Sequence, residues 1–161
     1  MATSTDFDDW YAENYARVLV AVALVLGPDR DRAEDATNEA FVQAFADWES
    51  VSQMNSPNGW VTKVAINRAR RFLRRRARGI ELLNQQRVET AAHDRHVDLD
   101  LWGALEVLSF RQRKAIVLRY VEGLSQAEVA SELEIAPGTA AATLSQARGV
   151  LKAELQKGDP S

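Results

Sequence analysis

The sequence predicts an all-α protein with two small helical domains, and three observations lead to this fold class. Apolar residues recur at spacings of three and four along most of the chain, as they do on one side of an α-helix. No segment alternates polar and apolar residues as a half-buried strand does. A polar stretch, residues 79–97, separates the two helical regions and is interpreted as a linker. We therefore expect domains at residues 1–78 and 98–161.

Composition limits the class of protein. The 161 residues are 46% hydrophobic and 27% charged, which suits a packed core under a charged surface. The absence of cysteine excludes disulfides, thiolate metal sites and cysteine nucleophiles. The longest apolar run, residues 18–26, is about half as long as a membrane-spanning helix, and the acidic start does not resemble a secretory signal. We expect a cytoplasmic protein without membrane contact.

Three long helices are predicted in the first domain, over residues 7–26, 31–47 and 57–76. The first ends at Gly27 and Pro28, because both residue types interrupt helices. Acidic residues cluster in the first turns of the second helix, where the helix dipole favours them. Residues 49–58 are rich in Ser, Asn and Pro, so they are predicted to form a loop before the third helix.

Four helices are predicted in the second domain, over residues 101–108, 110–122, 125–134 and 137–155. Ser109 precedes the second of them as an N-cap residue. Ser125, with Glu128 three residues later, has the spacing of a capping box and opens the third. The periodicity of the second helix predicts that Tyr120 is buried.

Residues 124–151 have the pattern of a helix-turn-helix motif. A short helix, a tight turn and a second helix follow one another, and Ala127 and Val129 are among the residues expected to pack inward. In that motif the second helix enters the major groove of DNA. An ordinary helical hairpin has the same spacing, so periodicity alone favours neither interpretation.

Positive charge is concentrated in one helix. Residues 1–62 contain three basic and eleven acidic side chains, whereas residues 63–78 contain eight basic side chains and no acidic one. Arginines at spacings of three and four give this helix a positive surface, which can neutralise phosphates and release counterions. The pattern favours contact with nucleic acid or with an acidic protein. The eight basic residues are Lys63, Arg68, Arg70, Arg71, Arg74, Arg75, Arg76 and Arg78.

For the remaining candidate residues, a structural role is the better interpretation. Trp60 could stack on an unpaired base, but a place in the core is the better interpretation. His93 and His96 lie three residues apart in the linker, without the further ligands that a metal site needs. Asp35 and Glu39 are one turn apart, and an acidic surface is a simpler explanation for them than paired catalytic carboxylates. With no phosphate-binding loop and no nucleophile–base pair, we expect neither an enzyme nor a cofactor.

Taken in order, these segments resemble the extracytoplasmic-function sigma factors, the minimal two-domain class of the sigma-70 family. Residues 33–48 (AEDATNEAFVQAFADW) are similar to the segment that binds core RNA polymerase. Residues 56–76 (SPNGWVTKVAINRARRFLRRR) are similar to the promoter-melting and −10 segment, and residues 108–152 to the −35 domain. The resemblance implies a sigma region 2 domain of three to four helices followed by a sigma region 4 helix-turn-helix domain.

The resemblance also implies roles for particular residues and partners. Core RNA polymerase would be contacted by Asp35, Glu39, Phe41 and Gln43. The loop at residues 49–58 would capture an unpaired −10 base, and the −10 contacts would be Asn55, Trp60, Lys63, Asn67, Arg68, Arg71 and Arg75. The −35 contacts would be Thr139, Thr143, Gln146, Arg148 and Lys152. The partners would be core RNA polymerase, promoter DNA and an anti-sigma factor or other regulatory protein.

The recognition helix departs from the family pattern. Family members carry basic residues soon after the Gly-Thr that begins this helix, but residues 138–146 of this chain contain no cation. We therefore expect weak −35 contact, strengthened by Ala140→Lys and Thr143→Arg. An alternative is a sigma-like interaction protein whose second domain binds a protein instead of −35 DNA. A repressor dimer of the helix-turn-helix type is a third, less favoured hypothesis.

Overall fold

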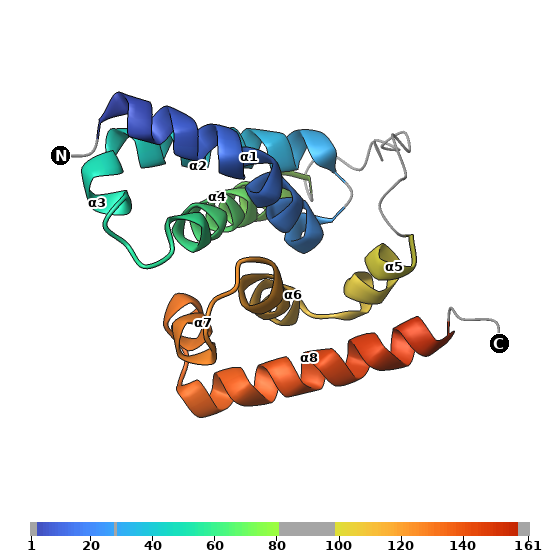
Figure 1. Cartoon of the computed structure of the whole chain (residues 1–161). Helices are drawn as coiled ribbons and strands as arrows, with labels where there is room; N and C mark the ends of the chain where they lie inside the picture. Colours follow the sequence, from blue (N-terminus) through green and yellow to red (C-terminus); the bar gives the residue numbers. More distant parts are fainter. Residues whose placement is uncertain (1–2, 28, 81–98, 158–161) are drawn as a thin grey trace. The chain divides into compact units, whose positions relative to one another are not determined.

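The computed structural model describes residues 3–27, 29–80 and 99–157, and every regular element in those ranges is a helix. The chain divides into two compact units, residues 1–91 and 92–161 (Figure 1). Each unit has its own buried apolar core. The predicted all-α fold class with two helical domains is confirmed.

Three long helices build unit 1: α1 (Ser4–Leu26), α2 (Arg30–Ala46) and α4 (Pro57–Ile80). Each packs against the other two. A capping box at Thr3 and Asp6 begins α1, with hydrogen bonds of 2.9 and 3.2 Å. The helix ends at Gly27, whose φ of 99° is strained for any residue with a Cβ atom. The interior includes Val18, Val22, Val25, Ala33, Ala40, Val61, Ala65 and Ile66.

A short helix, α3 (Trp48–Val51), occupies part of the segment predicted to be a loop. The side chain of Trp48 is 9% exposed and that of Val51 is fully buried. Burial of these two apolar residues stabilises a turn of helix that the polar composition of the segment does not predict. Only residues 52–56 are left to connect α3 and α4.

An aromatic cluster joins α1 to α2 and α3. Its rings lie between 4.8 Å (Trp10 to Trp48) and 6.0 Å (Phe7 to Tyr11) apart, measured between centroids. Several pairs meet edge to face, an arrangement favoured by the charge distribution of aromatic rings. The members are Phe7, Trp10, Tyr11, Tyr15, Phe41, Phe45 and Trp48.

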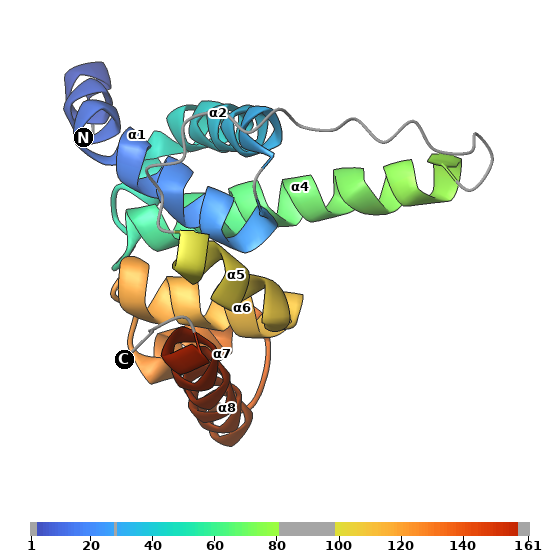
Figure 2. The ribbon, with the colours of Figure 1, turned by 90° about the vertical axis from the view of Figure 1, so that its right-hand side faces the viewer.

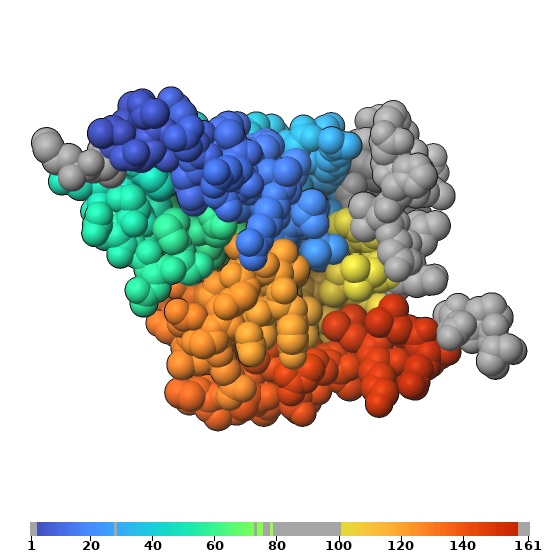
Figure 3. Space-filling model, in the orientation of Figure 1, coloured from blue at the N-terminus to red at the C-terminus, as the bar shows by residue number. Residues whose placement is uncertain are grey.

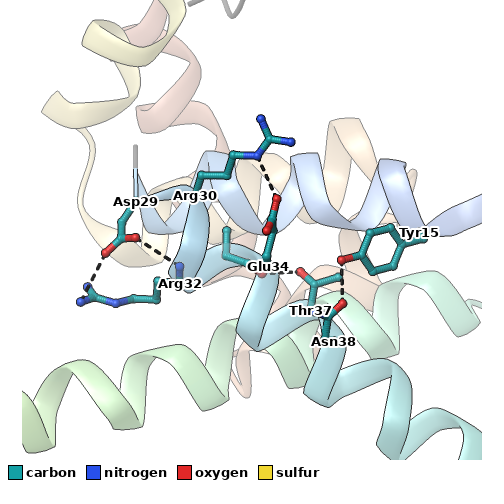
Figure 4. Close-up of polar contacts among 8 residues, drawn as sticks. Tyr15, Asp29, Arg30, Arg32, Glu34, Thr37 and Asn38 are labelled. Atoms are coloured by element: carbon teal, nitrogen blue, oxygen red, sulfur yellow. Dashed lines mark hydrogen bonds and ion pairs between the residues drawn. The ribbon is translucent and has the colours of Figure 1, made fainter. Parts of the chain in front are cut away.

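Polar contacts near this cluster join α2 to α1 and stabilise the turns of α2 (Figure 4). The Tyr15 hydroxyl of α1 donates to Asn38 Oδ1 of α2 at 2.6 Å. The buried Thr37 hydroxyl donates to a backbone carbonyl one turn earlier, at 2.7 Å. At the start of α2, the Asp29 carboxylate accepts from the backbone N–H of Arg32 and caps the helix. Of these contacts, the Tyr15–Asn38 hydrogen bond joins α2 to α1, and the other two stabilise α2 itself.

Unit 2 comprises α5 (Leu99–Val107), α6 (Phe110–Ile116), a π-helical turn η1 (Val117–Val121), α7 (Gln126–Leu133) and α8 (Pro137–Lys157). The long α8 packs against α5, α6 and α7. Ser109 caps α6, and Ser125 forms the predicted capping box with Glu128 at the start of α7. Both N-cap predictions are confirmed.

The π turn changes which residues of the predicted 110–122 helix are buried. The chain continues from α6 into η1 without a break, and Glu122 N–H bonds to the Val117 carbonyl five residues earlier. A π turn holds one residue more than an α turn, so the side chains that follow it change direction. Tyr120 is 53% exposed, and its predicted burial is therefore wrong. Ala127, also predicted to pack inward, is exposed on α7.

Candidate functional site

The outer face of α2 is acidic with one apolar residue. Alanines on the opposite side of the helix, such as Ala33 and Ala40, are fully buried, so the far side of the helix is directed outward. Asp35 and Glu39 are exposed, and Gln43 is partly exposed. Val42, which the sequence analysis did not select, is 70% exposed on the same side. We refer to Asp35, Glu39, Val42 and Gln43 as the α2 outer face.

Phe41 does not belong to that face. Its side chain is 2% exposed and lies between the rings of Trp10, Tyr11 and Tyr15, at centroid distances of 5.2, 5.0 and 5.5 Å. A side chain enclosed in this way cannot contact a partner protein directly. The predicted contact role of Phe41 is therefore corrected: the residue supports α2 from inside the unit. The exposed aromatic residue of α2 is Phe45, at 54%.

The basic helix is α4, and its C-terminal half carries a row of exposed arginines. Its inner side is apolar, with Val61, Ala65 and Ile66 fully buried against α1 and α2. In Figure 2 the C-terminal half of α4 extends beyond these two helices. The arginine row, which we define by its described and exposed members, consists of Arg70, Arg71, Arg74, Arg75 and Arg78.

The predicted −10 residues near the middle and start of α4 are less exposed than this row. Lys63, Asn67 and Trp60 are each partly buried. Trp60 is therefore neither fully in the core nor free on the surface. Asn55 is exposed in the loop that precedes α4. The structure thus places a loop residue and a partly exposed indole at the N-terminal end of α4.

Arg68 connects two sites that the sequence analysis treated as separate. Its Nη2 donates to Gln43 Oε1 at 2.6 Å, and its Nη1 lies 3.5 Å from Glu39 Oε2. A residue predicted to face DNA thus bonds to two residues predicted to face the polymerase. The ion pair is solvent-exposed, so it contributes at most about 1 kcal/mol to stability. In the structure described, the Arg68 guanidinium is directed toward the α2 outer face.

In unit 2, α7 and α8 form the helix-turn-helix. Glu134 ends α7 in the left-handed conformation, with φ of 55°, and its N–H bonds back into the last turn of α7. Pro137 begins α8, where its missing N–H removes no helical hydrogen bond. Because the C-cap of α7 is Glu134 and α8 begins at Pro137, the turn between them is tight, and α8 is the second helix of the motif.

The packed side of α8 includes two positions that were expected to face DNA. Ala140 is fully buried, and Thr143 is 9% exposed with its hydroxyl donating to the Thr139 carbonyl at 2.8 Å. A contact of Thr143 with base edges is therefore corrected, because the side chain faces the interior and its hydroxyl is already bonded. Ala140→Lys and Thr143→Arg would introduce charge into the core. They would not restore a DNA-binding surface.

From its start to Gln146, the exposed part of α8 is uncharged, and the exposed cations Arg148 and Lys152 come later in the helix. Thr139 and Gln146, both predicted to contact the −35 element, are exposed there. The α8 outer face, as we define it, consists of Thr139, Ala142, Ser145, Gln146 and Gly149. It offers three hydrogen-bonding side chains and no cation, so it provides little attraction for phosphates.

The two predicted cations of α8 lie beside a groove and point away from Thr139. Arg148 follows Thr139 by nine residues, about two and a half helical turns, so it projects from the opposite side of the helix. Its Nη1 donates to the Tyr120 hydroxyl at 2.8 Å. Arg148 and Lys152 flank an open, mainly apolar groove of about 550 Å³. The other residues lining the groove are Ile116, Tyr120, Leu151, Leu155 and Gln156.

No metal site or membrane helix is found in the described part of the chain. Within residues 3–27, 29–80 and 99–157, no three His, Asp or Glu side chains gather as metal ligands would. No helix in these ranges has the length and apolar character needed to cross a membrane. His93 and His96 lie outside the described residues, as does most of the predicted linker.

Two family models match the chain in the order of its two units. The model of sigma-70 region 2 matches residues 11–79, which include most of α1 and all of α2, α3 and the arginine row. The model of sigma-70 region 4 matches residues 98–151, which include the helix-turn-helix. Together the two matches extend over most of the chain.

Individual relatives agree with these models over nearly the whole length. The chain is 30% identical over 156 residues to an RNA polymerase sigma-E factor of Streptomyces avermitilis, and the match covers 91% of this chain and 86% of that protein. It is 30% identical to the ECF RNA polymerase sigma factor SigE of Mycolicibacterium smegmatis, over 92% of this chain and 62% of SigE.

A solved structure also matches both units. The sigma factor RpoE of Bartonella quintana, determined in complex with the anti-sigma factor NepR, superposes with a TM-score of 0.78 at 27% identity. That match covers 96% of this chain and 99% of RpoE. The sequence relatives, the two family models and this fold agree, and they show that the chain belongs to the extracytoplasmic-function class of the sigma-70 family of RNA polymerase sigma factors.

Proposed function

We propose that unit 1 performs both polymerase docking and −10 opening, and that the second unit contributes less to promoter affinity. The observation that carries this proposal is the placement of charge. Unit 1 combines an acidic, partly apolar α2 outer face with five exposed arginines on α4, whereas the α8 outer face has no charge. Affinity for nucleic acid depends mainly on cations that neutralise phosphates.

The α2 outer face is the proposed polymerase-docking surface. Val42, exposed at 70%, supplies apolar area that is released from water when a partner covers it. Asp35, Glu39 and Gln43 supply polar contacts around it. A small apolar centre with a polar rim is the usual composition of a protein–protein interface. Phe41 supports this surface from below and does not take part in the contact.

The arginine row and the loop before α4 form the proposed −10 site. Melting requires a surface that holds the displaced strand, and a row of cations along one helix can follow its phosphates. The exposed Asn55 and the partly exposed Trp60 lie just before and within the first turn of the same helix, where an unpaired base would be held. Arg68 belongs to the site only when it leaves Glu39 and Gln43.

Unit 2 has two surfaces that could bind a partner: the α8 outer face, which could bind DNA, and the groove beside Arg148, which could bind a protein. The uncharged α8 outer face allows a weak −35 contact through Thr139, Ser145 and Gln146. The groove beside Arg148 favours a second candidate role, protein docking, because apolar walls with flanking cations suit a partner segment with acidic residues. The RpoE relative was determined with an anti-sigma factor. We propose that this chain also has an anti-sigma partner.

The proposed role includes no chemical step in this chain. Nucleotide addition belongs to the polymerase, and the chain would act in the cytoplasm, where promoter DNA is found. Its contribution is binding energy: it attaches to core polymerase and stabilises the opened −10 strand.

Run-off transcription with reconstituted holoenzyme tests this division of roles. Promoters are first selected from a pooled template library with the wild-type chain. Arg71→Gln with Arg75→Gln should reduce run-off product on linear duplex templates while core-polymerase binding in a pull-down stays unchanged. Arg111→Gln, which removes one exposed cation from unit 2, is the control and should retain activity. Full activity of the α4 variant would refute the proposed −10 role of the arginine row.

A further inference from the structure

Both ends of the loop at residues 52–56 are attached to Trp10 of α1. Before the loop, the ring of Trp48 in α3 packs on the Trp10 ring, with centroids 4.8 Å apart. After the loop, Asn58 in the first turn of α4 accepts a hydrogen bond from Trp10 Nε1 at 2.9 Å. A single side chain, 42 or more residues away from the loop in sequence, therefore contacts a residue on each side of it.

The Asn58 amide makes contacts through both of its polar atoms. Its oxygen accepts from Trp10, and its Nδ2 donates to Asn14 Oδ1 at 2.6 Å. Asn14 Nδ2 in turn donates to the Trp10 backbone carbonyl at 2.8 Å. The three residues form a closed ring of hydrogen bonds, all partly buried. Because the oxygen and nitrogen of Asn58 have different partners, only one orientation of its amide satisfies the ring.

The loop between these attachments is anchored at its base and exposed at its tip. At the base, Val51 is fully buried, and the Ser56 hydroxyl accepts from Gly59 N–H at 3.1 Å. At the tip, Gln53, Met54 and Asn55 are exposed. Figure 3 shows the blue surface of α1 adjoining the teal surface of α3 and the loop. The contacts with α1 therefore fix the ends of the loop and leave its tip available.

We propose that Trp10 and Asn58 are positioning residues for the selection of the unpaired −10 base. They hold the two ends of the loop at one separation, so that Asn55 and Trp60 meet the base in a single geometry. Selectivity depends on hydrogen-bonding groups held within about 0.5 Å of their working positions. A loosened loop accommodates more than one base. This inference rests on the proposed −10 role of the loop and adds the residues that make it selective.

A purely structural role of the same contacts has a different signature. Loss of stability lowers the fraction of active protein, and this reduces binding to every DNA by the same factor. Loss of positioning weakens binding to the preferred base more than binding to the others. The ratio of affinities for preferred and replaced −10 bases is therefore the informative quantity.

The experiment uses holoenzyme and bubble DNA selected from a pool randomised in the unpaired −10 strand. Affinity is measured for the selected DNA and for the same DNA with each −10 base replaced in turn. Asn58→Ala and Trp10→Phe each remove the Trp10–Asn58 hydrogen bond, and each should lower the discrimination ratio by about fivefold. The double variant should show no further decrease, because both changes remove the same bond.

Two additional variants make the test specific. Asn58→Asp keeps an oxygen that can accept from Trp10 but loses the amide N–H that donates to Asn14, so it should lower the discrimination ratio only in part. Tyr15→Phe is the matched control: it removes another aromatic donor of α1, the one that bonds Asn38 of α2, at a distance from the loop. The Tyr15 hydroxyl is protonated at neutral pH even at its ordinary pKa, and burial raises that pKa further, so the group donates. Its loss should leave the ratio unchanged.

The outcomes separate the inference from the function on which it rests. Unchanged discrimination in folded Trp10→Phe and Asn58→Ala holoenzymes would overturn the inference while the loop keeps its −10 role. An equal decrease in Tyr15→Phe would overturn it as well, since the effect would then not be specific to the contacts that Trp10 and Asn58 make beside the loop. A wild-type holoenzyme that does not discriminate at all would refute the proposed loop role itself. If Asn58→Ala does not fold, Trp10→Phe decides the question.

Discussion

Helices α4 and α8 are both long, both amphipathic and both members of units that match nucleic-acid-binding sigma regions, yet their outer surfaces differ. The exposed side of α4 carries five arginines, whereas the α8 outer face carries none and its nearest cations flank a groove. The two helices have comparable apolar inner sides. The comparison shows that packing determines which side of a helix is buried, while the charge of the other side is free to differ. Electrostatic attraction for DNA is therefore expected mainly from α4.

Removal of charge from α4 should have the largest effect. Arg71→Gln, Arg74→Gln and Arg75→Gln together should weaken holoenzyme binding to a pre-opened −10 bubble and lower the salt dependence. The slope of log K against log salt should decrease by roughly 2, at about 0.7 for each lost single-strand contact. Fluorescence anisotropy between low and physiological salt measures this slope. An unchanged slope would show that the arginines of α4 do not contact the DNA phosphates, contrary to the proposed difference between α4 and α8.

Addition of charge to α8 tests the other side of the comparison. Ala142→Lys with Gly149→Lys places two cations on the α8 outer face, and a side chain at Gly149 would meet no neighbouring atom within 4 Å. Binding to duplex −35 DNA should strengthen, and its salt slope should increase by roughly 0.9 for each new contact. Ala140→Lys is the matched control on the buried side. It should destabilise unit 2 by about 1–3 kcal/mol and leave DNA affinity without any gain.

Loss of polar groups from the α2 outer face should lower the affinity for core polymerase and leave the stability of the fold nearly unchanged. Asp35→Ala with Gln43→Ala should reduce affinity for core polymerase by about five- to tenfold. The free energy of unfolding should change by about 1 kcal/mol or less, because Asp35 is exposed and Gln43 loses only its hydrogen bond with Arg68. Affinity for a −10 bubble oligonucleotide is the internal comparison. A decrease in DNA binding equal to that in polymerase binding would show that the α2 and α4 surfaces do not act separately.

The smallest effect is expected from Gly149→Ala. Replacement of an exposed glycine inside a helix stabilises it by about 0.5–1 kcal/mol, because alanine loses less conformational entropy on folding. Differential scanning calorimetry should show unit 2 melting a few degrees higher. DNA binding should not change if α8 approaches the duplex only loosely. A clear loss of −35 affinity would indicate that the backbone at Gly149 lies close to DNA, and the contrast with α4 would be smaller than proposed.

The sequence by itself was sufficient for features that depend on neighbouring residues. Helix starts at Ser109 and Ser125 were predicted because a capping side chain bonds within its own turn. The end of α1 at Gly27 and the charge of α4 were likewise visible in the sequence. The all-α class with two helical domains followed from these local signals together with helical periodicity.

Only the tertiary structure decided which side of each helix is used. Phe41 is enclosed by rings from α1, and Trp48 and Val51 form α3 because the same unit buries them. Tyr120 is exposed within the π turn, and Ala140 and Thr143 face the other helices of unit 2. Arg68 bonds to residues of α2 that are distant in sequence. The physical reason is common to all of these. Periodicity shows that a helix has an apolar and a polar side, but contacts with residues distant in sequence decide which side chains are buried.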